Sequence, residues 1–162
     1  RSIAVTGVQT CALPILKTIA QILESKDREI ISIRPTDSVL VALEVLAAYN
    51  IGALPVVDEG RLAGIFSERD YARKVALKGL TSALTEVREI MTSKVHCATL
   101  QQSVIDCMGM MTDKHIRHLP VLDGGQLVGM LSIGDLVKAI IEDQQFQIQQ
   151  LEAYINPALS LH

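Results

Sequence analysis

The sequence predicts a mixed α/β (α+β) fold in which one β-α-β-β-α unit is built twice. Three observations predict it. Residues 30–70 align without a gap with residues 95–135, at an offset of 65, and 12 of the 41 aligned positions are identical. Each copy alternates short apolar runs with stretches of 3.6-residue apolar spacing. Apolar residues make up 49% of the 162, enough for one good core or for two small cores that lean on each other.

In the first copy, the apolar run 30–33 is closed by Pro35 and predicts a strand. Asp37 or Ser38 can cap a helix with apolar positions at helical spacing. Two further strands around the turn Asp58-Glu59-Gly60 predict a hairpin, and a helix follows. The predicted ranges are strand 30–33, helix 39–46, strands 54–57 and 61–66, and helix 68–77.

The second copy repeats this order, with strand 95–98, helix 103–114, strands 119–122 and 126–131, and helix 133–142. Upstream, residues 19–26 match residues 87–94 at an offset of 68. We therefore expect a first unit at 17–78, a linker at 79–86, a second unit at 87–143 and a C-terminal tail helix at 144–162. A three-stranded sheet is marginal alone, so the units should pack as one pseudo-twofold domain with clefts between them. The tail is expected to dock on this body or on a second subunit.

The first fifteen residues are set apart from the fold. Val5 to Ile15 reads VTGVQTCALPI, which resembles the in-frame translation of a sequencing-library adapter. A native edge strand over VTGVQT is the alternative. We interpret residues 1–15 as not native, so the native start lies outside this sequence. A cytoplasmic location is expected, with organelle targeting left open.

Charge, hydropathy and cysteine spacing exclude several classes of partner and site. A net charge of −3, with 20% charged residues, provides no basic field for nucleic acid. No apolar run approaches the roughly 18 to 20 residues that a membrane span requires. Cys11, Cys97 and Cys107 form no ligand-spaced cluster, so neither a metal site nor a disulfide framework is expected.

The stretches GIFSERD (64–70) and GMLSIGD (129–135) carry the functional hypothesis. Each places a serine where a strand ends and a helix begins, with an aspartate three residues later. Amide groups of a helical first turn favour anions, and an aspartate can accept hydrogen bonds from the two hydroxyls of a ribose. A capping box, in which the serine and the aspartate only satisfy the helix end, is the alternative.

Three segments resemble a tandem pair of cystathionine-β-synthase (CBS) domains, also called a Bateman module. They are NIGALPVVDEGRLAGIFSERDYARKV, VREIMTSKV and HIRHLPVLDGGQLVGMLSIGDLVKAI. The likeness spans about residues 17–141 and is closest to small stand-alone bacterial proteins with relatives in plant organelles. It implies an energy-sensing regulatory module that binds AMP, ADP or ATP, and in some members NADH or S-adenosylmethionine. It also implies a homodimer, a regulated partner protein and no required cofactor.

The resemblance places adenine beside the first strand of each unit and the turn before the second strand. The implied first cleft comprises Ile31, Gly52, Ala53, Pro55, Ser67, Arg69 and Asp70. The implied second cleft comprises His96, Arg117, His118, Pro120, Ser132 and Asp135. Gly134 stands where the first copy has Arg69, so we expect unequal affinities. His96 and His118 add the hypothesis of a pH-sensitive nucleotide site.

Two other functions compete with this interpretation. An enzyme is disfavoured, because the sequence has no GxxxxGK phosphate loop, no Ser/His/Asp order and no paired carboxylates, and almost every residue belongs to the two repeated units. A CBS pair that has lost its ligands and serves only as a dimerisation scaffold is the alternative to a nucleotide sensor.

Overall fold

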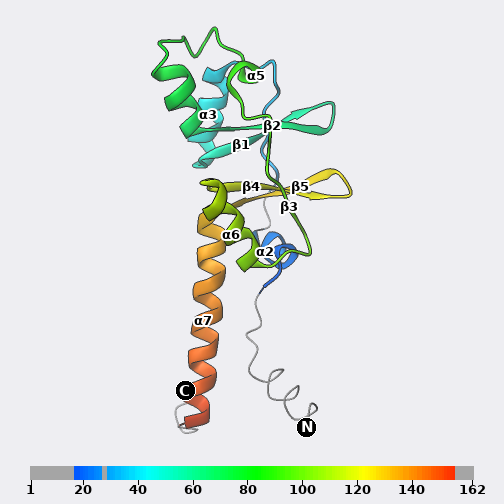
Figure 1. The fold of residues 1–162 in the computed structure, drawn as a ribbon, viewed down its shortest axis with the longest axis vertical. Helices are drawn as coiled ribbons and strands as arrows, with labels where there is room; N and C mark the ends of the chain where they lie inside the picture. Colours follow the sequence, from blue (N-terminus) through cyan, green and yellow to red (C-terminus); the bar gives the residue numbers. More distant parts are fainter. Residues whose placement is uncertain (1–16, 27–28, 156–162) are drawn as a thin grey trace.

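A computed structural model describes residues 17–26 and 29–155, and the adapter-like segment 1–15 lies outside these residues (Figure 1). Two halves are stacked along the long axis of the molecule. Their hairpins face each other at the centre, and the helices lie above and below (Figure 1). Each half has its own cluster of buried apolar residues. The predicted mixed fold built from a repeated unit is confirmed.

The first half consists of α3 (Val39–Tyr49), β1 (Ala53–Asp58), β2 (Arg61–Ser67), the short α4 (Glu68–Asp70) and the π-helix η1 (Tyr71–Ala76). Ser38 caps α3 by accepting a hydrogen bond from the Val41 amide at 3.2 Å. β1 and β2 form the predicted antiparallel hairpin. The predicted helix 68–77 is therefore present as one α-helical turn that continues with π-helical hydrogen bonding.

The predicted third strand of this half is reduced to one parallel bridge between Ile33 and Val56. The Ile33 amide donates to the Pro55 carbonyl at 3.1 Å, and the Val57 amide donates to Ile33 at 2.9 Å. The next hydrogen bonds in a parallel ladder would require amides from Pro55 on one side and Pro35 on the other. Proline has none, so the ladder ends in both directions.

The second half consists of β3 (Ala98–Thr99), α6 (Val104–Lys114), β4 (His118–Asp123), β5 (Gln126–Ser132) and α7 (Ile133–Ile155). Its sheet has the order β3-β4-β5, with β3 parallel to β4 and β4 antiparallel to β5. Here Leu100 replaces Pro35 and the parallel pairing extends by one residue, to Thr99.

Each half is completed by a helix that precedes the other repeat in the chain. α2 (Ile19–Lys26) inserts Ile19 and Ile22 into the core of the second half. α5 (Val87–Ile90) inserts Val87 and Ile90 into the core of the first half. The two leading helices are therefore exchanged, and the halves in space do not follow the repeats along the chain.

The last helix differs from the expected arrangement. α7 begins at Ile133, passes residue 143 without a break and ends at Ile155. Its buried residues stop at Asp143, and beyond that point it stands away from the body (Figure 1). A tail docked on the body is therefore wrong for residues 144–155. Among the described residues, no helix has both the length and the apolar character that a bilayer crossing would need.

Candidate functional site

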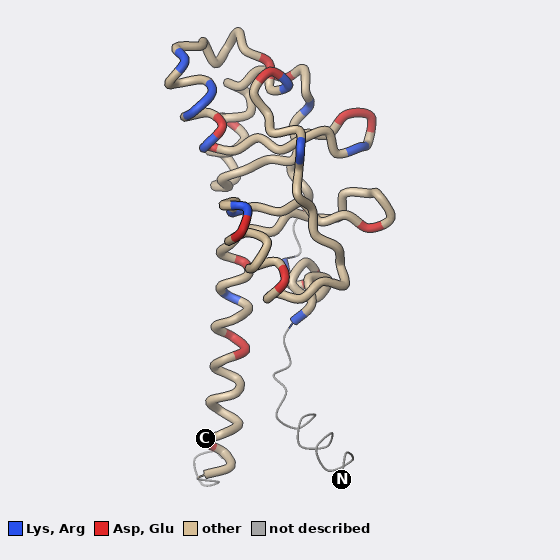
Figure 2. The backbone as a smooth tube through the Cα atoms, viewed as in Figure 1, with Lys and Arg blue, Asp and Glu red and all other residues tan. Residues whose placement is uncertain are grey.

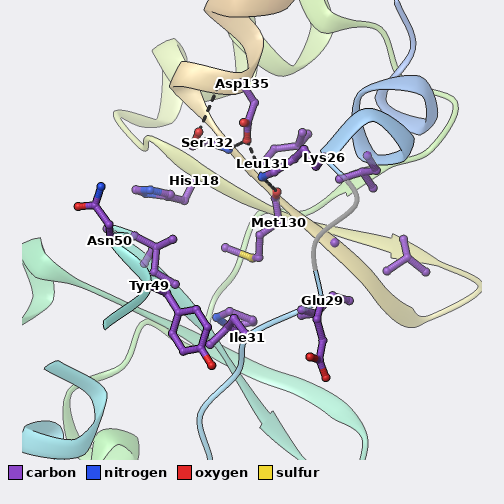
Figure 3. Close-up of a pocket in the computed structure, with 18 residues that line it drawn as sticks. Lys26, Glu29, Ile31, Tyr49, Asn50, His118, Met130, Leu131, Ser132 and Asp135 are labelled. Atoms are coloured by element: carbon purple, nitrogen blue, oxygen red, sulfur yellow. Dashed lines mark hydrogen bonds and ion pairs between the residues drawn. The ribbon is translucent and has the colours of Figure 1, made fainter. Parts of the chain in front are cut away.

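A cavity of about 610 Å³ lies between the two halves (Figure 3). In the first half its wall comprises Ile31, the end of α3, the turn 50–52 and the start of β1. In the second half it comprises β4, β5 and the start of α7, together with the end of α2. The lining residues are Leu23, Lys26, Glu29, Ile30, Ile31, Tyr49, Asn50, Ile51, Gly52, Ala53, Pro55, His118, Val128, Gly129, Met130, Leu131, Ser132 and Asp135.

The polar end of this cavity is the first turn of α7. The Ser132 amide donates to the Asp135 carboxylate at 2.8 Å, and the Asp135 amide donates to the Ser132 hydroxyl at 3.2 Å. The Ile133 amide donates to the Arg117 carbonyl at 2.9 Å. The capping box that sequence analysis held as the alternative is present here, and its carboxylate also lines the cavity.

Lys26 of α2 supplies a cation at the same place. Its ammonium donates to Asp135 Oδ2 and to the Met130 carbonyl, both at 2.9 Å (Figure 3). The two side chains are 26% and 22% exposed, so this ion pair is partly shielded from water. A smaller cavity of about 270 Å³, bordered by Lys17 and Lys138, shares both residues in its wall.

The surroundings of Asp135 keep its carboxyl ionised. Burial alone raises the pKa of Asp135. The hydrogen bond from Lys26 and those from Ser132 outweigh burial and bring the pKa below its ordinary value. The cavity therefore offers a carboxylate acceptor at neutral pH.

The opposite end of the cavity is mostly apolar. Ile31, Ala53 and Pro55 contribute aliphatic surface, and Tyr49 and Asn50 stand at the rim (Figure 3). Asn50 adopts a left-handed conformation, with φ of 52°, where α3 ends. This turn brings Gly52 against the His118 ring, so that a methyl group at Gly52 would lie 3.3 Å from its Cε1 atom.

His118 is half-buried beside Gly52. Burial lowers the pKa of the His118 imidazole, and nearby Lys26 and Arg117 lower it further, against the opposing effect of Asp135. Below the ordinary pKa of histidine, the unfolded state therefore binds a proton at this side chain more readily than the folded state does. The free energy of unfolding has its full value above the unfolded pKa of about 6.5 and falls as the pH drops below it.

This sign gives a first prediction. His118→Gln is expected to lose less stability than wild type between pH 7.5 and pH 5.5, because no imidazole has to be kept neutral. Chemical denaturation at both pH values measures the difference. The exposed His96 offers a matched control, and His96→Gln should follow the wild type. An acid-induced loss of equal size in His118→Gln would contradict the argument.

The corresponding helix tip of the first repeat is closed by its own side chains. Asp70 is only 7% exposed and accepts hydrogen bonds from the Ser67 amide and hydroxyl, both at 2.9 Å. Thr92 donates to its other oxygen at 3.1 Å, and the Lys74 ammonium lies 2.9 Å from that oxygen. Asp135 has Ala139 at the position equivalent to Lys74.

Arg69, the cation expected in the first cleft, points elsewhere. Its guanidinium donates to the carbonyl of His115 at 2.7 Å. His115 ends α6 in a left-handed conformation, where helix carbonyls lack helical partners. Arg69 therefore joins the two halves by completing the end of α6.

The structure distributes the predicted site residues across the repeats. Seven of the thirteen line the cavity: Ile31, Gly52, Ala53, Pro55, His118, Ser132 and Asp135. The other six lie outside its lining: Ser67, Arg69, Asp70, His96, Arg117 and Pro120. The cavity thus draws four residues from the expected first cleft and three from the second.

Three residues of the cavity wall were not predicted from the sequence: Lys26, Tyr49 and Asn50. Lys26 lies before the ungapped repeat, and only the exchange of leading helices brings it to Asp135. Its match to Lys94 at an offset of 68 was the available signal. Tyr49 and Asn50 end a helix, where periodicity reports only on the buried face.

Two α+β halves with exchanged leading helices, and a cavity between them, define a tandem-repeat module. The CBS domain family profile matches residues 19–77 and 87–142, and the chain belongs to the CBS domain family. The mitochondrial CBS domain-containing protein CBSX3 of Arabidopsis thaliana is 39% identical over 148 residues, which cover 86% of this chain and 72% of that protein.

Solved structures give the same result. A protein with CBS domains from Burkholderia ambifaria MC40-6 is 50% identical, with a TM-score of 0.76 over 79% of this chain and 96% of that one. The CBS domain pair of protein MJ0100, solved with 5′-methylthioadenosine and S-adenosyl-L-methionine, is 28% identical. Its TM-score is 0.68, over 77% of this chain and 96% of that one.

Proposed function

We propose that this chain is a non-catalytic regulatory module that binds an adenine nucleotide or a related adenosine in the cavity between its halves. The observation that carries the proposal is the position of Asp135. This ionised carboxylate lies at the start of α7, at one end of a cavity of about 610 Å³ whose other end is apolar. The MJ0100 pair, with its two adenosine ligands, supports this ligand class.

In this proposal each end of the cavity holds one part of the ligand. Asp135 accepts hydrogen bonds from the two ribose hydroxyls, since a carboxylate can take both. Adenine lies among Ile31, Ala53 and Pro55, where Tyr49 can cover it. The amides of Ile133 and Asp135 already donate within the protein. Gly134 between them is exposed and carries no side chain, so a phosphate would approach the first turn of α7 at the Gly134 amide.

Lys26 makes the site responsive to the charge of the ligand. Its ammonium is paired with the Asp135 carboxylate in this structure, so the ribose hydroxyls must compete with Lys26 for that carboxylate. A phosphate on the ligand can form a new ion pair with the displaced ammonium, whereas a neutral nucleoside cannot. We therefore expect the site to prefer AMP to adenosine.

One ligand per chain follows from the difference between the two tips. Asp70 is held by four donor groups from Ser67, Thr92 and Lys74, and a ribose would have to displace them.

The ligand would change the contacts between α2, α7 and the first half, and a partner protein or a second copy of the chain would respond to that change. No cofactor is required.

A thermal-shift panel with adenosine, AMP, ADP, ATP, NADH and S-adenosylmethionine tests the proposal. A ligand at 100 times its dissociation constant stabilises a protein by about 2.7 kcal/mol, or roughly 5 to 10 °C for a chain of this size. Lys26→Met should reduce the shift with AMP and leave or increase the shift with adenosine. No shift with any of these ligands would refute nucleotide binding and favour the dimerisation scaffold.

A further inference from the structure

The exposed part of α7 carries an apolar stripe that the ligand site does not use. Along the helix its residues are spaced alternately by four and three: Val137, Ile141, Gln144, Ile148, Leu151 and Ile155. The five apolar members are 41–78% exposed. We call these six residues the α7 seam.

The seam lies on a different face from the one that holds α7 to the body. Leu136, Ala139 and Asp143 are the buried residues of this helix. At about 100° per residue, the seam is centred roughly 120° around the helix from them. Residues 144–155 have no buried member and only one charged side chain, Glu152, so most of this stretch is tan in Figure 2.

A second helix would account for the helical structure of this stretch. Residues 144–155 extend a helix that its packed first part already nucleates, but most of the stability of a helix in a protein comes from packing of an apolar face, and these residues have no buried member. Apolar residues that repeat every 3.5 positions on average, rather than every 3.6, meet another helix along their whole length in a left-handed supercoil. The spacing of the seam therefore matches a coiled-coil partner.

We infer that the α7 seam pairs in parallel with the α7 seam of a second copy of this chain. Gln144 decides between a second copy and an unrelated apolar partner, because a buried amide needs a polar group opposite it. In a parallel pair in register, each Gln144 faces the other Gln144. Gln147 then lies beside Glu152 of the second copy, so no like charges meet.

A membrane surface fits this stretch less well. Helices that lie on membranes carry lysine or arginine on their polar face. Residues 144–155 contain neither, and their polar positions are mostly glutamine.

A pairing surface of about 27 Å between Val137 and Ile155 is short, so we expect a reversible dimer whose average mass depends on protein concentration.

Sedimentation equilibrium of the full chain over a range of concentrations tests the inference. Wild type should approach twice the mass of one chain. The double variant Ile148→Asp/Leu151→Asp, with two charges in the seam, should weaken association at least tenfold. Gln149→Asp/Gln150→Asp adds the same charge outside the seam and should behave as wild type. Both variants should keep the wild-type melting temperature of the body, since none of these side chains is buried.

Cysteine cross-linking separates the seam from any other dimer contact. In a Cys11→Ser/Cys97→Ser background, Leu151→Cys should form a disulfide between two chains on mild oxidation. Gln149→Cys, outside the seam, should form little. Equal cross-linking at the two positions would overturn the inference, as would an unchanged mass in the charged seam variant. Neither readout uses a nucleotide, so failure here leaves the proposed ligand site untouched.

Discussion

Asp135→Ala is expected to weaken binding of AMP by ten- to a hundredfold. In the proposed complex the variant would lose hydrogen bonds from the ribose hydroxyls to a charged acceptor, each typically about 1.5 to 3 kcal/mol. Part of that loss is offset, because Lys26 no longer has to leave the carboxylate before the ligand enters. Isothermal titration with AMP measures the effect. Unchanged affinity would remove Asp135 from the site.

Asp70 is the matched control, since it occupies the same position in the first repeat. Asp70→Ala is expected to leave the affinity for AMP within about twofold. It should cost roughly 2 kcal/mol of stability, because Ser67, Thr92 and the partly buried Lys74 lose a shared acceptor. Titration should also give one ligand per chain in wild type. A large loss of affinity in Asp70→Ala would show that the first tip opens and binds.

Gly64→Ala is expected to destabilise the protein by about 2 to 3 kcal/mol. A methyl group at Gly64 would lie 2.8 Å from the Thr92 carbonyl oxygen and 2.7 Å from Met91 Sδ. The carbonyl is fixed by two hydrogen bonds of 2.9 Å between Ile65 and Thr92, so the backbone after α5 would have to shift. Denaturant unfolding measures the loss.

Gly129 is its counterpart in the second repeat and serves as the control. A methyl group there would meet only the Leu23 side chain, 2.7 Å from Cδ2. Leu23 lines the cavity and can turn toward it, so Gly129→Ala should cost less than about 1 kcal/mol. Binding of AMP should weaken instead, because the displaced side chain narrows the slot. Equal destabilisation by the two substitutions would show that Leu23 is as rigid as the Thr92 backbone.

The repeat and its elements could be predicted from the sequence, because they depend on local signals. Ser38 and Ser103 cap their helices, and the Asp58 and Asp123 turns join their hairpins, as expected from residues adjacent in the chain. The length of the parallel ladder also depends on local residues, since Pro35 and Pro55 withhold amides.

The composition of the candidate site could not be predicted in the same way. An offset of 65 indicates which residues are equivalent, but not which of them face each other across the boundary between the two halves. The exchange of α2 and α5 is a tertiary choice between two similar cores, and short apolar helices such as IAQILESK and VREI fit either one. Lys26 and the closed state of Asp70 both depend on that choice.

The exchanged helices also determine how the protein loses its structure. A fragment that ends within residues 79–86 would lack Val87 and Ile90, and the remaining fragment would lack Ile19 and Ile22. Each would expose a core groove that only the other can fill. Heating should therefore melt the described body in one cooperative transition, and mixing the two fragments should restore folded protein that neither forms alone.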